Sequence, residues 1–325
     1  MRLMHALVLA LIATPALAQP PQVVTDIPPV HALTAGVMGD LGQPTILLDQ
    51  GSDPHHFQLR PSQAQALSQA DLVLWVGPRL TPWLARAIDG VGIQGQAISL
   101  IDAPDTYRRS FGAKEDAHEH EHEDAHEEEH EHDHDAAEQG ALDADGHDHA
   151  KTGTDPHAWL DPENARVWTR LIAAKLSALD PENAATYAAN AATTLAAIDT
   201  AEAETRAILA PVGSAPIMVF HDAYGYFSAH FGVNVAGSIA LGDAAAPGAA
   251  RLRAQQDQLT DEGIVCLFPE AQHDPAYVAA IVEGTATRVG RPLDPSGSTL
   301  AYGPGLYGAL LTGLATTIAE CVTTP

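Results

Sequence analysis

Short apolar runs alternate with helix-forming stretches on both sides of a central polar segment, and this repeated rhythm limits the folds open to the chain. Strands separated by helices build β-α-β units, in which the strands lie parallel and the helices cover the sheet. Strands are expected at residues 45–49, 71–77, 97–101, 216–220, 233–239, 264–268 and 288–293. The sequence therefore predicts an α/β protein with two lobes, each built on a mainly parallel sheet.

A long helix is predicted between the two sets of strands. Residues 161–163 are Asp-Pro-Glu, an N-capping residue followed by Pro at the first helical position, so a helix should run from there to about Leu179. The segment 181–210 is rich in Ala without internal Pro or Gly, which favours a second helix about 45 Å long. Such a helix suits a strut between two lobes, although an ordinary amphipathic packing helix has the same pattern. Ligands of open α/β sheets bind at the carboxyl ends of strands, in this case in the cleft between the lobes.

The segment 115–149 carries nine histidines and sixteen carboxylates in thirty-five residues and contains no Lys or Arg. Imidazole is a good ligand for zinc, copper and nickel, and the acids add charge and oxygen donors. A solvated acidic linker is the alternative, but a linker chosen for solubility alone has no use for imidazole. We expect a disordered loop over 113–154 that binds metal weakly at several places, through His118, His120, His122, His126, His130, His132, His134, His147 and His149.

The first eighteen residues have the features of a secretory signal peptide. A basic start at Arg2 is followed by an apolar stretch from 6 to 13 and by Ala16-Leu17-Ala18, a small-residue cleavage site. No cysteine follows, so we expect an exported periplasmic protein without a lipid anchor, and no later segment is expected to span a membrane. The formal net charge of -26 leaves -10 outside the loop, which disfavours nucleic acid and favours cations.

The only two cysteines, Cys266 and Cys321, can form one intramolecular disulfide in an oxidising compartment. A pair of buried free thiols is the alternative.

Four residues place a candidate metal ligand after an expected strand or in a loop that enters a helix. They are His55, His157, His221 and Asp294, at separations of 102, 64 and 73 residues. No local zinc-finger spacing relates them, so they can share an ion only if the fold brings strand-end loops of the two lobes together.

The sequences around these residues resemble the metal receptors that serve ABC transporters for zinc and manganese, and most closely the ZnuA-type zinc receptors. The matching segments are Pro-His-His-Phe-Gln-Leu-Arg-Pro-Ser at 54–62, Ala-Asp-Leu-Val at 70–73, His-Ala-Trp-Leu-Asp-Pro-Glu at 157–163 and Phe-His-Asp-Ala-Tyr-Gly-Tyr-Phe at 220–227. Pro247-Gly248 and Leu293-Asp294-Pro295 follow in the same order, so the resemblance covers nearly the whole mature chain.

The resemblance implies that the three histidines are metal ligands and that Asp294 or a water completes the site. Manganese receptors of this family usually have a carboxylate at the third position, where this chain has His221, so Zn²⁺ is the expected ion. Some zinc receptors have an acid before the first histidine, but here Pro54 stands there. His56 is a local alternative to His55 as the first ligand. Three other histidines, His31, His230 and His273, match no ligand position. Asp222 and Glu270 are candidates to orient the imidazoles.

The expected function is capture of periplasmic Zn²⁺ for an inner-membrane ABC permease and its ATPase. The alternatives are a zinc buffer or chaperone without a transporter, a receptor for another divalent metal such as Mn²⁺, and a zinc hydrolase, for which no motif is present outside the loop. A periplasmic zinc chaperone is a further candidate partner, and a monomer is expected. The expected plan is signal peptide 1–18, N-terminal lobe 19–180, linking helix 181–210 and C-terminal lobe 211–325.

Overall fold

The computed structural model describes residues 20–111, 153–240 and 249–324, and within them the strands form two parallel sheets. The first sheet has the order β2-β1-β3-β4, and the second has the order β6-β5-β7-β8. All their pairings are parallel, as the sequence predicts. The strands are β1 (Val23–Thr25), β2 (Thr45–Ile46), β3 (Leu72–Trp75), β4 (Gln96–Ser99), β5 (Ile217–His221), β6 (Val235–Ala240), β7 (Cys266–Leu267) and β8 (Arg288–Val289).

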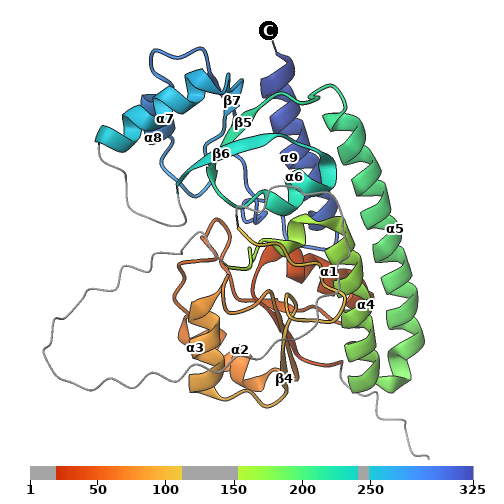
Figure 1. Ribbon diagram of the computed structural model, residues 1–325. Helices are drawn as coiled ribbons and strands as arrows, with labels where there is room; N and C mark the ends of the chain where they lie inside the picture. Colours follow the sequence, from red (N-terminus) through yellow and green to blue (C-terminus); the bar gives the residue numbers. More distant parts are fainter. Residues whose placement is uncertain (1–19, 112–152, 241–248, 325) are drawn as a thin grey trace, which may run out of the picture.

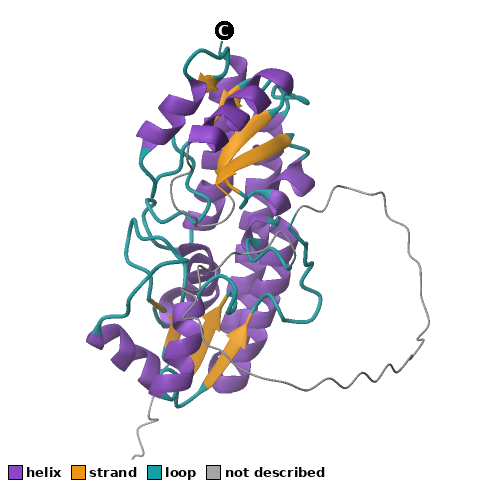
Figure 2. Ribbon diagram, turned by 60° about the vertical axis from the view of Figure 1, so that its left-hand side comes forward, coloured by secondary structure: helices purple, strands orange, loops and turns teal. Residues whose placement is uncertain are grey.

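Helices flank both sheets, so the molecule has two α/β lobes, one above the other in Figures 1 and 2. The α-helices are α1 (Pro28–Met38), α2 (Pro61–Gln69), α3 (Pro82–Val91), α4 (Pro162–Leu179), α5 (Ala184–Leu209), α6 (Gly225–Phe231), α7 (Ala249–Asp261), α8 (Pro275–Val282) and α9 (Leu306–Thr323). Short 3₁₀ helices are η1 (Gly39–Leu41), η2 (Ala158–Leu160) and η3 (Pro181–Asn183). Five of the α-helices carry Pro in their first turn, where its missing N–H costs no intrahelical hydrogen bond.

The helix α5 links the lobes, as expected from the Ala-rich segment. It has 26 residues, about 39 Å of helix, and runs along one side of the molecule past both lobes (Figure 1). Its buried residues are three, four or seven positions apart, and the helix packs against α1, α4 and α9, so the strut is also a packing helix. The predicted helix begins three residues early, because Pro181 starts the 3₁₀ turn η3 before α5.

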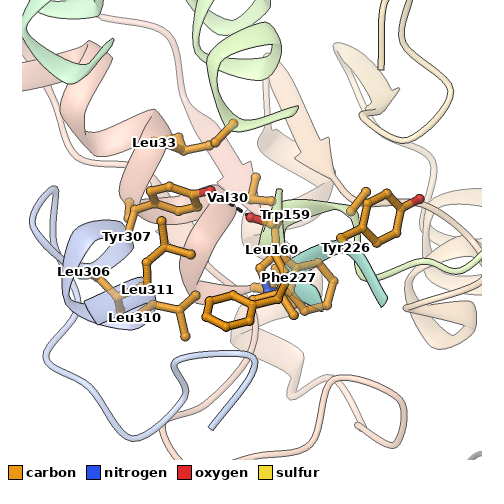
Figure 3. Packing of buried hydrophobic residues seen from close by; sticks show 14 of the residues in the cluster. Val30, Leu33, Trp159, Leu160, Tyr226, Phe227, Leu306, Tyr307, Leu310 and Leu311 are labelled. Carbon is orange, nitrogen blue, oxygen red and sulfur yellow. Dashed lines mark hydrogen bonds between the residues drawn. The ribbon is translucent and has the colours of Figure 1, made fainter. Parts of the chain in front are cut away.

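One hydrophobic cluster extends through both lobes. Figure 3 shows Trp159 and Leu160, next to the candidate ligand His157, packed between α9 on one side and α6 on the other. Trp159 is almost completely buried; its indole N–H donates to Pro295 O at 2.8 Å, and its carbonyl oxygen accepts from the Tyr307 hydroxyl at 2.9 Å. The segment that carries His157 is therefore held by the C-terminal lobe as well as by its own.

Several strands differ from those predicted by the sequence, and these predictions were wrong. β1 was not predicted, β2 is shorter than the predicted 45–49, and β8 ends at Val289, short of the predicted 288–293. Leu293 instead makes an isolated parallel bridge with Glu270. Short apolar runs do not show where a strand ends, because its edges depend on the register of its neighbours.

The C-terminal helix α9 was also overlooked as an apolar segment. By length and composition it is the one helix of the described residues that could cross a membrane, with a mean hydropathy of 1.3. Its leucines, with Tyr307 and Ile318, lie buried against the shared core, and α9 packs along α5. This packing explains its composition as that of a core helix.

The two cysteines form the expected disulfide, which ties β7 to α9. Their Cα atoms are 6.3 Å apart and their sequence separation is 55 residues. No free cysteine exists, so the alternative of two buried thiols is excluded.

We expect reduction of this disulfide in the metal-free protein to lower the free energy of unfolding by about 4 kcal/mol, the chain-entropy value for a loop of 55 residues. Urea denaturation with and without reductant measures the difference. The double variant Cys266→Ser/Cys321→Ser is the control and should not respond to reductant. Equal unfolding free energies for the oxidised and reduced protein would contradict a stabilising role.

Candidate metal centre

Three histidines from distant parts of the chain meet between the lobes. One ring nitrogen from each of His55, His157 and His221 lies within 4.8 Å of the others, and no second such group occurs in the described part of the chain. The Nε2 atoms of His157 and His221 are 3.4 Å apart. Nitrogens bound tetrahedrally to one Zn²⁺ at 2.0–2.1 Å lie about 3.3 Å apart, so this pair is already at a distance suited to zinc.

The first histidine comes from the loop between β2 and α2, where His55 is chosen over its neighbour His56. The carbonyl oxygen of Pro54 accepts the Trp83 indole N–H at 2.8 Å, and the His55 backbone N–H donates to Asp53 at 2.9 Å. The Trp83 side chain is buried in the N-terminal lobe, so the loop is fixed just before the imidazole.

The second histidine stands immediately before η2. The Nδ1 atom of buried His157 lies 2.7 Å from Asp155 Oδ1, which also accepts the His157 backbone N–H at 2.9 Å. A carboxylate at Nδ1 holds the proton there and leaves the Nε2 lone pair for a metal. Burial raises the pKa of Asp155 to about 7, although the backbone N–H of His157 and the charges of His221 and Arg109 oppose that rise. Asp155 was missed in the sequence analysis.

The third histidine is the last residue of β5. His221 Nδ1 lies 2.7 and 2.6 Å from the two oxygens of Glu270, a buried carboxylate that also accepts the Tyr224 hydroxyl at 3.2 Å. The expectation that Glu270 orients an imidazole is thus confirmed. Asp222, the other candidate, is exposed and lines a separate cavity of about 640 Å³. Although the residue is exposed, partial desolvation of its carboxyl and the nearby charge of Asp155 raise the pKa of Asp222.

The histidines line a cavity of about 20 Å³, enough for one water-sized occupant. A cavity of this size suits a single ion and excludes an organic ligand. The rest of its lining is Asp53, Pro54, Trp159, Glu270, Gln272, His273, Pro295 and Ser296.

The fourth predicted ligand, Asp294, is not part of the three-histidine group and does not line the cavity. Both of its oxygens accept hydrogen bonds from neighbouring residues. Direct ligation by Asp294 stays a prediction.

Of the remaining histidines, two have roles that the sequence did not reveal. His273 stacks on Phe220, with ring centroids 4.1 Å apart, and lines the cavity. His230 lies 3.0 Å from Asp161 and 2.9 Å from Glu202; burial lowers its pKa, but these two carboxylates raise the pKa by more. His230 therefore joins α6 to the start of α4 and to α5. The nine histidines of the loop and the expected signal peptide lie outside the described residues.

Comparison with known proteins gives one family. Residues 23–321 match the family described as "ZnuA: Zinc-uptake complex component A periplasmic". The chain is 51% identical to the high-affinity zinc uptake system protein ZnuA of Paracoccus denitrificans, over 98% of this chain and 97% of that protein. It is 36% identical to the protein of the same name from Brucella abortus, over 92% and 91% of the two chains.

Two solved structures illustrate the shared fold. A ZnuA lacking residues 138–173 in its own numbering, described as zinc-bound, has a TM-score of 0.70 at 21% identity and covers 94% of this chain and 99% of that one. The periplasmic zinc-binding protein TroA of Treponema pallidum has a TM-score of 0.71 at 17% identity, over 94% and 100% of the chains. Both confirm the two-lobed α/β architecture.

Replacement of Asp155 by Ala should weaken zinc binding by about 10- to 100-fold, because His157 loses the acceptor that fixes its ring and tautomer. Competition with a chromophoric chelator measures the affinity. Asp222→Ala removes a nearby carboxylate that lines the separate cavity, and this control should bind zinc nearly as the unaltered protein does. Equal losses of zinc affinity in the two variants would show that Asp155 acts through its negative charge and not by orienting the His157 ring.

Proposed function

The chain belongs to the ZnuA family of periplasmic zinc-uptake components, and from this premise we propose that it captures Zn²⁺ in the periplasm and delivers it to an ABC transporter. The proposed ligands are His55, His157 and His221. The family is a metal-uptake component rather than an enzyme.

The observation that carries this proposal is the three-imidazole group around a cavity for one ion. Nitrogen donors favour zinc over manganese, which prefers oxygen, so the donor set supports zinc as the substrate. Glu270 and Asp155 are buried carboxylates directly behind two of the rings. Their charges face an arriving dication across the imidazoles and offset the cost of removing its water.

The small size of the cavity also argues against a zinc hydrolase. A catalytic zinc needs room for its substrate beside the metal and a general base near the bound water. About 20 Å³ leaves no such room, and Glu270 is turned toward His221 Nδ1. A buffer without a transporter would require the same site, and genes for a permease and an ATPase beside this one distinguish the receptor from the buffer.

The roles of the histidine-rich segment, the partners and the route of export are proposed from the sequence. We propose that the histidine-rich segment collects or senses zinc at weaker sites and raises its local concentration beside the cleft. The proposed partners are an inner-membrane permease with its ATPase and a periplasmic zinc chaperone, and the protein acts as a monomer. We also propose that cleavage after Ala18 releases the mature chain into the periplasm.

Deletion of residues 115–149 should leave about one tightly bound zinc per mature chain, because the three proposed ligands lie outside the deletion. Metal analysis and zinc titration of the two proteins measure the number of sites and their affinities. The deletion should remove only the weaker sites. Loss of all tight binding would move the principal site into the deleted segment.

His221→Ala should reduce zinc affinity far more than His273→Ala, because only the former belongs to the three-histidine group. Both residues line the same cavity, which makes them a matched pair. Calorimetry on the metal-free proteins measures both affinities. A similar loss in the two variants would reject the ligand assignment.

A further inference from the structure

Two loops from opposite lobes are hydrogen-bonded to each other beside the metal centre. The backbone N–H of Gly51 donates to Ser298 O at 3.0 Å, and the Gln50 side-chain amide donates to Leu300 O at 3.2 Å. We call these contacts, between residues 49–51 and 298–300, the interlobe latch. Its N-terminal side ends at Gly51, four residues before His55, so the latch lies in the same loop as this proposed ligand.

The loop on the C-terminal side is shaped by the carboxylate of Asp294. Its Oδ2 accepts the Thr299 backbone N–H at 2.8 Å and the Thr299 hydroxyl at 2.6 Å, and its Oδ1 accepts the Ser298 backbone N–H at 3.1 Å. Gly297, with φ +66°, provides the left-handed turn that brings these groups back to the carboxylate. Asp294 therefore holds the two residues whose carbonyl oxygens, with that of Leu300, face the other lobe.

The same carboxylate reaches the wall of the cavity through its neighbours. Asp294 Oδ1 also accepts the Gln272 amide at 3.2 Å and the Ser296 hydroxyl at 3.1 Å, and both of these residues line the cavity. A carboxylate has about four lone-pair directions, and these donors already use both oxygens. Ligation of a metal by Asp294 would break the bonds that shape the loop.

On the N-terminal side the latch is equally well anchored. The guanidinium of Arg60 makes a bidentate pair with Asp49, at 2.5 and 2.6 Å, across the loop that contains His55. The Gln63 side-chain amide donates to Leu47 O at 2.6 Å and joins the two ends of that loop again, just outside the Asp49–Arg60 pair. Because the two ends of this loop are bonded to each other, a contact that holds residues 50 and 51 also restricts the position of His55 in the same loop.

We propose that Asp294 is a positioning residue, which builds the interlobe latch that sets His55 opposite His157 and His221, and that it is not the fourth metal ligand. This inference rests on the proposed zinc-binding function. The protein then supplies three imidazoles and leaves the fourth position of a tetrahedral zinc to solvent. A site without a protein oxygen ligand discriminates more strongly against manganese.

The discriminating variant is Thr299→Val, which removes a hydroxyl donor and leaves the carboxylate intact. If Asp294 positions the latch, zinc affinity should fall about fivefold, because the loop loses a bond to a charged group. If Asp294 is a ligand, freeing its Oδ2 should leave the affinity unchanged or raise it, and that outcome overturns the proposal. Chelator competition on the full mature chain gives both values.

A double-mutant cycle tests whether Asp294 acts through the latch. Asp294→Ala should weaken zinc binding about tenfold and Gln50→Ala about threefold. The double variant should resemble Asp294→Ala, because both changes break the same contact, whereas independent effects would multiply to about thirtyfold. Independence would overturn the proposal. The circular dichroism spectrum and melting temperature of each metal-free variant show whether it is folded. If Asp294→Ala does not fold, the zinc affinity of Thr299→Val alone tests the proposal.

The coordination itself can be read with Co²⁺ in place of zinc, because its visible absorption reports the number and kind of its ligands. A positioning role predicts the same band positions and intensity for Asp294→Ala as for the unaltered protein, once both are saturated. A changed spectrum would make Asp294 a ligand. If His221→Ala still binds zinc tightly, the proposed function is wrong. If His221→Ala loses tight zinc binding but the Asp294 and Thr299 variants differ from the results expected above, only the latch inference is wrong.

Discussion

Trp159 is buried where the two lobes meet, with its indole N–H bonded to the loop at Pro295 and its carbonyl oxygen bonded to Tyr307 of α9. The hydrophobic cluster around it includes residues of both sheets, and Figure 3 shows the part of it near Trp159. Because close-packed interiors do not deform continuously, this shared core fixes the relative position of the lobes. The metal centre depends on that position, since His157 lies two residues before Trp159 and His221 ends β5, just before the helix α6 that packs against Trp159.

In each lobe, hydrogen bonds to neighbouring residues hold the imidazole rings of the proposed ligands in position. Glu270 and Asp155 each hold one Nδ1 and direct the opposite nitrogen into the cavity, and the Trp83 indole fixes the carbonyl oxygen next to His55. These supports are buried, so they cost little entropy when the ion arrives. A preformed group of this kind favours tight binding of a single ion, and a histidine-rich segment that must be ordered around each ion pays that cost at every site.

The carboxylates near the centre divide into two kinds. Asp155 and Glu270 touch imidazoles and carry the charge that faces the dication, whereas Asp294 touches hydroxyls and backbone N–H groups of its own loop. The residue type is the same, but the donors around each one differ. Those donors explain why an aspartate that follows a ligand motif in sequence can act on the fold between the lobes instead of on the metal.

The sequence by itself determined the α/β class, the parallel strands, the linking helix α5, the helix α4 with its Asp161 cap, the disulfide pairing and which three histidines meet between the lobes. These follow from local signals: apolar periodicity, caps, a unique pair of cysteines, and motifs that resemble a known family. Only the tertiary structure decided that Asp155 supports His157, that His273 lines the cavity, and that Asp294 lies outside the three-histidine group and is hydrogen-bonded within its own loop. Such outcomes depend on side-chain directions set by packing between segments far apart in the chain, which no local pattern of residues records.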